Sequence, residues 1–149
     1  MGYSITQAKP SDDQEELTSL INRNFQKNDP QWFNWSQRQN PFGENLCWLA
    51  REESVGKLIG STGLLRRRMN YGGQSFVVGQ AEAINIDEAH RSAQAALKLQ
   101  RALISHLPET DFHFVYGMTE TAAAVFKRCR YKQIGTFQHW VKPLRSEYK

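Results

Sequence analysis

The stretch AINIDEAHRSAQAALKLQRALI, residues 83–104, begins as an apolar strand and ends as an amphipathic helix. A short joint between the two contains acidic residues, a His, an Arg and a Ser, and alanines follow it. Four backbone N–H groups at the start of a helix lack helical partners, and the helix dipole adds partial positive charge there. Arg91 would add a charge-assisted contact. The joint therefore predicts a site for an anion such as phosphate.

The same joint also fits an ordinary strand-to-helix turn. In that interpretation Asp87 or Ser92 caps the helix, the alanines reflect helix propensity, and Arg91 lies in solvent. Small residues suit both interpretations, because they leave room for a ligand to approach the backbone and for the helix to pack on a sheet. They are Ser92, Ala93, Ala95 and Ala96. The residues alone leave this choice open.

Length and composition indicate one folded domain, which we assign to residues 1–149. Apolar residues make up 40% and aromatic residues 11% of the sequence, which is enough for a hydrophobic core. The formal net charge is +4, and the basic residues are spread along the chain. This mild excess suits an anionic ligand, but it is too small and too dispersed to indicate nucleic-acid binding.

The cysteines and histidines do not indicate a metal site or a disulfide framework. Cys47 and Cys129 fit neither spacing and lie in apolar segments, so we expect small buried side chains. The four histidines show no metal-ligand spacing. No apolar run approaches the length of a membrane span and no signal-peptide pattern opens the chain, so we expect a soluble, cytoplasmic protein without membrane contact.

Hydrophobic periodicity and turn residues predict the remaining elements. Expected strands cover residues 3–9, 45–52, 57–70, 75–86, 111–118 and 131–144, and expected helices cover 11–25, 92–106 and 120–129. The glycines of YGGQ, residues 71–74, predict a tight turn, because glycine readily adopts positive φ. An antiparallel meander followed by alternating strands and helices predicts an α+β fold, in which a mixed sheet carries helices on its faces.

The joint and its surroundings resemble a known family. The segment HRSAQAA, residues 90–96, is similar to the acyl-CoA-binding motif of GNAT-type N-acetyltransferases, which reads Arg or Gln, two residues, Gly, one residue, and Gly or Ala. Arg91 opens the motif, Gln94 holds its first Gly position, and Ala96 closes it. The expected order of elements resembles that of the family over most of the chain. The segments WFNWSQRQNPFGENLCWLARE and AAAVFKRCRYKQIGTFQHWVKPL are similar to the region before the family's second strand and to its last helix and strand.

The resemblance implies a GNAT-like acyl-CoA N-acyltransferase fold, with acetyl-CoA as co-substrate and no metal. Acetyl-CoA would lie in a splay between two parallel strands, one ending near Ile86 and the other near Gly117. The pantetheine arm would pair with the backbone of the first strand, and the pyrophosphate would bind N–H groups at the start of the helix. The implied cofactor-binding residues are Ile84, Asn85, Ile86, Arg91, Ser92, Ala93, Gln94, Ala95, Ala96, Thr121 and Phe126.

The family's chemistry implies that an amine of a small molecule or peptide attacks the thioester after a base has removed a proton from the amine. Glu82 is the candidate base because it lies on the strand leading to the motif, although a surface carboxylate on a half-exposed strand is an equal alternative. Tyr116 is a candidate to protonate the thiolate, although an aromatic of the core or rim is the more common role. Trp32 and Trp35 would form a wall for the acceptor, or else close the hydrophobic core.

Departures from the family pattern keep a second function open. Gln94 replaces the motif's first Gly, and Phe126 stands where the last helix commonly carries a Tyr that protonates the leaving thiolate. A phenylalanine has no proton to give. A catalytically weak or inactive acyl-CoA-binding module is therefore an alternative to the enzyme.

A third possible function, contact with nucleic acid or protein, would use Arg66, Arg67 and Arg68 near a strand end. Successive residues of a strand point to opposite faces, so the three cannot share one face. A solvated edge is the ordinary interpretation, and we do not expect nucleic acid as a partner. Trp140 and Val141 on the last expected strand suggest a possible homodimer.

Overall fold

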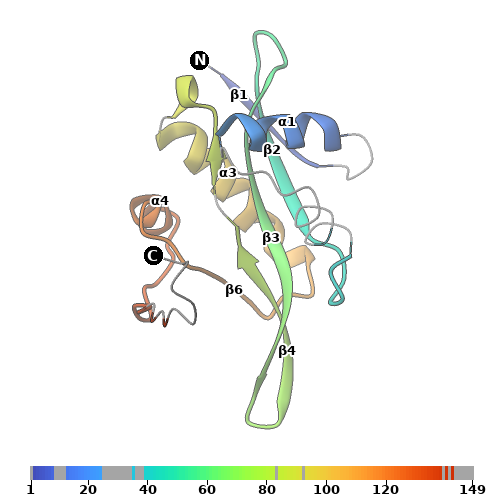
Figure 1. The fold of residues 1–149 in the computed structure, drawn as a ribbon, viewed down its shortest axis with the longest axis vertical. Coiled ribbons are helices and arrows are strands. Elements are labelled where there is room, and N and C mark those ends of the chain that lie inside the picture. The colour runs from blue at the N-terminus through green and yellow to red at the C-terminus, as the bar shows by residue number, and fades with distance from the viewer. Residues whose placement is uncertain are drawn as a thin grey trace.

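A computed structural model describes residues 2–8, 13–24, 35, 39–82, 84–91, 93–138, 140 and 142. These residues form a six-stranded sheet with helices on both faces (Figure 1). The strands are β1 (Tyr3–Gln7), β2 (Leu46–Glu52), β3 (Leu58–Tyr71), β4 (Gln74–Ala81), β5 (Asn85–Ile86) and β6 (Phe114–Gly117). The helices are α1 (Gln14–Asn24), α3 (Ala93–His106) and α4 (Ala123–Arg128), with short 3₁₀ helices η1 (Glu88–His90) and η2 (Leu107–Glu109). None of these helices is long and apolar enough to cross a membrane.

The sheet is antiparallel except for one pair of neighbouring strands, which confirms the expected mixed sheet. The strand order is β1-β2-β3-β4-β6, and β5 pairs with β3 off this path. β4 and β6 are the parallel pair, in register from Val78 opposite Phe114 to Ala81 opposite Gly117. β3 and β4 form a long hairpin that extends beyond the helices (Figure 1). The expected turn closes this hairpin, with positive φ at both of its glycines.

Each face of the sheet packs against one main helix. On one face the buried side chains of Leu99 and Leu103 join α3 to the strands, and we call this the α3 face. On the other, Leu17 and Leu20 join α1 to the strands, and we call this the α1 face. The three- and four-residue spacing of these leucines gives each helix one apolar side, which is what the sequence pattern predicted.

The last expected strand, residues 131–144, does not form in the residues that the structure describes. Residues 131–138 have no regular secondary structure. Ile134, Phe137 and Trp140 are 95%, 75% and 90% exposed. The prediction is wrong because apolar and β-branched residues make a strand only where a neighbouring strand is available to pair with them, and no pairing of this segment is observed within the described residues.

The joint before α3 also differs from the expected cap. Asp87 precedes η1, a 3₁₀ turn that the sequence did not predict, and its carboxylate makes no capping hydrogen bond. The carboxylate instead accepts hydrogen bonds from Arg23 at 3.2 and 3.0 Å and from the Asn24 amide at 3.3 Å. The prediction of a side-chain cap by Asp87 is therefore wrong, because its carboxylate is hydrogen-bonded to two residues at the end of α1 instead. Ser92, the other candidate cap, lies outside the described residues.

Candidate active site

β4 and β5 together form one interrupted strand beside β3. Ala81 pairs with Leu64 before the interruption, and Ile86 pairs with Gly60 after it. Five steps along the chain from Ala81 to Ile86 thus match four steps along β3 from Leu64 to Gly60, so the interrupted strand contains one extra residue. Such a β-bulge bends a strand and re-aims the side chains beside it. The bulge lies immediately before the joint that the sequence singled out.

The parallel pair opens at the same place. Pairing between β4 and β6 ends at Ala81 and Gly117, whereas the interrupted strand continues to Ile86 with β3 as its partner. Among the described residues, β5 therefore has a strand on one side only. An open strand edge can bind an extended chain that carries amide groups. β4 and β6 thus diverge beyond Ala81 and Gly117. We call the opening between them the splay.

The side chains of residues 84–86 are turned into the protein. Ile84 and Ile86 pack in the core of the α3 face. The side-chain oxygen of Asn85 accepts a hydrogen bond from the Asn24 amide at 2.8 Å. These three residues therefore offer the splay their backbone rather than their side chains.

Small residues and one ring line the splay on the α3 face. A Cβ on Gly117 would lie 3.0 Å from the ring of Phe126 and 3.3 Å from the Cβ of Ala81, so the glycine is needed for this close approach. The Phe126 ring also packs on Tyr131, with 4.7 Å between ring centroids. Phe126 thus supplies an apolar contact but no hydroxyl. Thr121, another expected cofactor residue, is exposed just before α4.

The start of α3 combines buried alanines with an exposed glutamine. Ala95 and Ala96 are buried against the sheet, which explains their small size. Gln94 is exposed, so the side chain in the motif's first Gly position lies at the surface. The backbone of Ala93 opens the helix, and its side chain, like Ser92, lies outside what the structure describes. Gln94 therefore does not fill the space between helix and sheet.

Arg91 lies at the end of the interrupted strand. Its backbone N–H donates to the carbonyl of Glu88 at 3.2 Å, so the 3₁₀ turn uses this donor. Its side-chain Nε donates to the carbonyl of Ile86 at 3.3 Å. The residue is exposed, and its guanidinium lies beside the strand end that borders the splay. The side chain of Arg91, rather than its N–H group, is thus placed to meet an anion.

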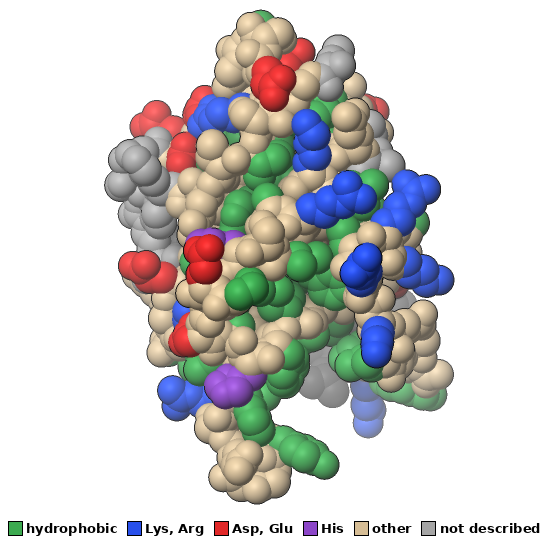
Figure 2. All heavy atoms as spheres, turned by 180° about the vertical axis from the view of Figure 1, so that it is seen from behind, with side chains coloured by type: hydrophobic (Ala, Val, Ile, Leu, Met, Phe, Trp, Pro, Cys, Tyr) green, Lys and Arg blue, Asp and Glu red, His purple; other side chains and the backbone are tan. Residues whose placement is uncertain are grey.

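Further basic side chains gather on the same side of the molecule. Figure 2 shows Lys and Arg side chains concentrated along the side of the α3 face on which α4 lies. The exposed basic residues of α4 and the segment after it are Lys127, Arg128, Arg130 and Lys132. Clustered positive charge raises the local concentration of an anionic ligand.

A row of polar side chains lies on the opposite, α1 face. The side-chain oxygen of Gln80 accepts hydrogen bonds from the Tyr116 hydroxyl at 3.3 Å and from the Arg67 Nε at 3.1 Å. Glu82 follows Gln80 by two residues, and residues two apart on a strand share a face. We call Glu82, Gln80, Tyr116 and Arg67 the polar row. It brings both expected catalytic residues, Glu82 and Tyr116, to one face of the sheet.

Glu82 is half-buried, and its carboxylate lies over β3. A Cβ on Gly63 would come within 3.1 Å of the carboxylate oxygen Oε2, so Gly63 leaves the space that the carboxylate occupies. Cys47 is the partner of Gly63 on β2. Burial, together with the nearby carboxylates of Glu82 and Asp13, raises the pKa of the Cys47 thiol to about 12. Glu82 thus lies at the inner end of the polar row, next to the bulge.

Trp35 lies at the other end of the polar row. The Arg67 guanidinium carbon is 6.0 Å from the centre of the Trp35 ring, within reach of a cation–π interaction. Trp35 is 44% exposed, so it is not a core residue. This position fits the expected wall beside the acceptor. Trp32, the other residue assigned to that wall, lies outside the described residues.

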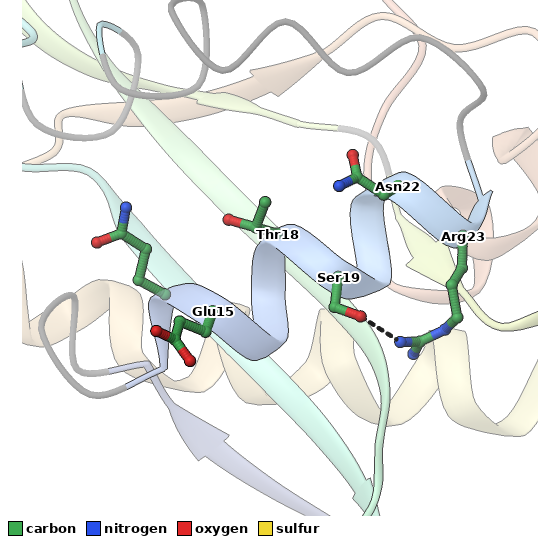
Figure 3. A pocket seen from close by; sticks show the side chains of 6 residues that line it. Glu15, Thr18, Ser19, Asn22 and Arg23 are labelled. Carbon is green, nitrogen blue, oxygen red and sulfur yellow. Dashed lines mark hydrogen bonds between the residues drawn. The ribbon is translucent and has the colours of Figure 1, made fainter.

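Other surface features of the described residues do not form a second candidate. Figure 3 shows a shallow hollow on the outer side of α1, where Ser19 and Arg23 are joined by a hydrogen bond of 3.0 Å. The described residues that line it all belong to this one helix, and Arg23 already forms an ion pair with Asp87. Within the described part of the chain, no group of three or more His, Cys, Asp or Glu residues is arranged to hold a metal ion.

The sequence did not single out Gln80 or place Arg67 in the site, although a signal was present. The two-residue turn at Gly72 and Gly73 sets the register of the β3–β4 hairpin and places Arg67 opposite Val78. Alternation along each strand then puts Arg67, Gln80 and Glu82 on one face. The register of the hairpin could therefore have predicted that Arg67 and Gln80 share a face with Glu82, which the residue types alone could not.

The mixed sheet with one parallel pair and flanking helices is the fold of the GNAT class. The model of the acetyltransferase (GNAT) domain family matches residues 5–134, and the chain belongs to this family. No curated protein matches the chain by sequence.

Several solved structures share the fold. Glucosamine-6-phosphate N-acetyltransferase from Arabidopsis thaliana aligns over 97% of this chain and 100% of its own, with a TM-score of 0.68 and 14% identity. AAC(6')-Iy in complex with a bisubstrate analog, CoA-S-monomethyl-acetylneamine, aligns over 96% of this chain and 99% of its own, with a TM-score of 0.70 and 13% identity. Ribosomal-protein-alanine N-acetyltransferase from Brucella melitensis biovar Abortus 2308 aligns over 96% and 100%, with a TM-score of 0.67 and 16% identity. At these identities the likeness shows the fold.

Proposed function

We propose that this protein is an acyl-CoA-dependent N-acetyltransferase that moves the acetyl group of acetyl-CoA to an amine of a small molecule or peptide. The observation that carries the proposal is the splay, where β6 leaves β4 at Ala81 and Gly117 while β5 keeps one edge open. Membership of the GNAT family supports it. The solved structures with this fold include enzymes named for a small sugar amine and for a ribosomal protein, so both kinds of acceptor stay open.

The residues around the splay fit acetyl-CoA. The open backbone edge of Ile84, Asn85 and Ile86 suits the amides of the pantetheine arm. The N-terminal end of α3, which begins at Ala93, suits the pyrophosphate, with Arg91 beside it. Gly117 keeps the α3 face of the splay narrow against Phe126, and Thr121 lies exposed just before α4. Acetyl-CoA supplies the acetyl group, and no metal is needed.

The polar row then supplies the proton transfers from the opposite face. Glu82, directly or through a water, takes a proton from the acceptor ammonium, and the free amine attacks the thioester carbonyl. A carbon–nitrogen bond forms, the nitrogen loses its second proton to solvent, and the carbon–sulfur bond breaks. The thiolate takes a proton from water or from the Tyr116 hydroxyl, which water then reprotonates. Trp35 forms a wall for the acceptor beside Arg67.

A second candidate function rests on one contact. Phe126 occupies the α3 face of the splay with no hydroxyl, which favours an acyl-CoA-binding module with weak or no catalysis. The third possibility, a nucleic-acid or protein contact by the arginine cluster, is less favoured because Arg66 forms an ion pair of 2.7 Å with Asp111. Assignment to one domain over residues 1–149, to the cytoplasm and to a homodimer stays a prediction.

The Glu82→Gln variant separates catalysis from binding. The amide keeps the shape of the side chain but cannot take up a proton, so an enzyme would lose at least about tenfold in kcat while acetyl-CoA affinity stays within about twofold. Steady-state kinetics and calorimetric binding measure the two quantities. An unchanged kcat would show that Glu82 is not the base, and no turnover by the parent protein with any amine would favour the binding module.

A further inference from the structure

Arg67 carries a positive charge that has no negative partner among the residues that the structure describes. No carboxylate of the described residues lies within 4.0 Å of its guanidinium, whereas the guanidinium groups of Arg23, Arg51 and Arg66 each pair with at least one. Its contacts are the neutral amide of Gln80 and the ring of Trp35. The side chain is half-buried, which weakens its hydration. A half-buried charge held by neutral groups is stabilised when an anion binds beside it.

The contacts of Arg67 also fix its orientation. Its Nε donates to the Gln80 side-chain oxygen, and its guanidinium carbon lies over the Trp35 ring. A guanidinium held in this way can present its terminal N–H groups to the two oxygens of a carboxylate or phosphate. The ring of Trp35, 44% exposed, adds a flat apolar surface next to this group.

The distance from Arg67 to the candidate base suits one small molecule that touches both. Arg67 contacts Gln80. Glu82 lies two residues further along the strand than Gln80 and on the same face, which separates these two residues by about 7 Å. An amine at Glu82 and an oxyanion at Arg67 would then be separated by only a few bonds. An acceptor with several ammonium groups would instead place positive charge against Arg67.

We propose that Arg67 binds an anionic group of the acceptor, so that the preferred substrates are primary amines carrying a carboxylate or phosphate a few bonds from the nitrogen. This inference rests on the proposed acetyl transfer. Its distinctive content is the substrate class, which the acyl-CoA site does not determine. Carboxylate and phosphate present the same oxyanion chemistry to a guanidinium, and the test separates them.

Matched pairs of amines test the substrate class. Phenylalanine with phenethylamine differs by a carboxylate, and O-phosphoethanolamine with ethanolamine differs by a phosphate. For each amine, release of the CoA thiol from acetyl-CoA gives kcat/KM. We expect the anionic member of at least one pair to react roughly ten- to a hundredfold better, the range for a charge-assisted hydrogen bond. Arg67→Met removes this preference, so that kcat/KM becomes equal for the two members of each pair.

Arg68→Met is the matched control, because Arg68 is next to Arg67 on β3 but on the opposite face, over the ring of Phe42. This variant keeps the preference for anionic amines. Equal kcat/KM for both members of both pairs, or a preference that survives in Arg67→Met, overturns the inference while leaving acetyl transfer in place.

A binding measurement distinguishes failure of the inference from failure of the proposed function. Thermal unfolding is followed with inorganic phosphate in the presence of saturating desulfo-CoA, which covers any phosphate site at α3. A phosphate-dependent rise in Tm that Arg67→Met loses and Arg68→Met keeps supports the anion site even if no amine is acetylated. If no amine is acetylated and phosphate gives no rise that depends on Arg67, the inference is wrong.

Discussion

Tyr131 joins the segment after α4 to the core through a chain of buried polar groups. Its hydroxyl donates to the Gln100 side-chain oxygen at 3.4 Å, and the Gln100 amide donates to the Thr62 hydroxyl at 2.7 Å. Gln100 is fully buried, so both of its hydrogen bonds lie in the core of the α3 face. A buried amide that lost these partners would be unsatisfied. This chain of contacts holds Tyr131 against Phe126 at the edge of the splay.

The position of Tyr131 makes folding stability depend on pH in the alkaline range. Burial raises the pKa of its hydroxyl from 10.0 to about 12. The folded protein therefore holds the proton more tightly than the unfolded chain does, so the stabilisation is complete below pH 10 and is lost as the pH rises toward 12. We expect Tyr131→Phe to reduce the fall in Tm over this range.

Thermal unfolding of the parent protein and of Tyr131→Phe across that range measures the effect. The buried thiol of Cys47, whose pKa is also raised, contributes to the alkaline loss in both proteins and is common to the comparison. Identical pH profiles for the two proteins would contradict the assigned environment of Tyr131.

At the residue scale, the sequence predicted which residues belong to the candidate site better than it predicted which residues contact one another. Glu82 was selected because it lies on the strand leading to the motif, and Tyr116 because it lies at the end of its strand. The structure places both on one face. Asp87 was assigned to a cap, but the pairing of its carboxylate with Arg23 depends on how α1 crosses the sheet. A contact between residues so far apart in sequence is set by tertiary packing, which local patterns do not encode.

Among the elements, β6 and α4 control how far the splay opens. Gly117 ends β6, and the Phe126 ring of α4 fills the space where its side chain would be. We expect Gly117→Ala to lower the free energy of unfolding by about 1–3 kcal/mol, because the new methyl group pushes the ring or the strand aside. The same displacement would widen the splay and weaken acetyl-CoA binding.

Gly135→Ala is the control for this prediction, because a Cβ at Gly135 would meet no atom within 4 Å. Urea unfolding gives the stability of both variants, and calorimetry gives their acetyl-CoA affinity. Parent-like stability of Gly117→Ala would mean that β6 and α4 separate easily, and that their packing does not determine the width of the splay.

The elements that the sequence predicted well are those whose structure is determined by their own residues. The strands of the meander and the two main helices have strong periodicity, and the turn at residues 71–74 has its two glycines. The segment 131–144 has strand-like composition, but it has no pairing partner among the described residues, and from Lys132 onward those residues lie exposed. The bulge between β4 and β5 was not predicted, because an extra residue in a strand is visible only against the register of its neighbour.

For the molecule as a whole, the splay joins two faces with different chemistry. The α3 face offers backbone edges, small residues and basic side chains, whereas the α1 face offers the polar row. A cofactor held from one face and an acceptor held from the other would meet where β4 and β6 separate. The fold class and the family were within reach of the sequence, because element order and one motif carry them, but the division between faces required the sheet.

The central claim, that the splay binds acetyl-CoA, is tested most directly by thermal unfolding with and without acetyl-CoA, with ATP as a control for phosphate binding alone. A ligand that binds only the folded state adds about 2.7 kcal/mol of stability at a hundredfold excess over its dissociation constant. We predict a rise in Tm with acetyl-CoA that ATP does not match. No rise at millimolar acetyl-CoA would contradict the claim and would mean that the fold is used for another partner.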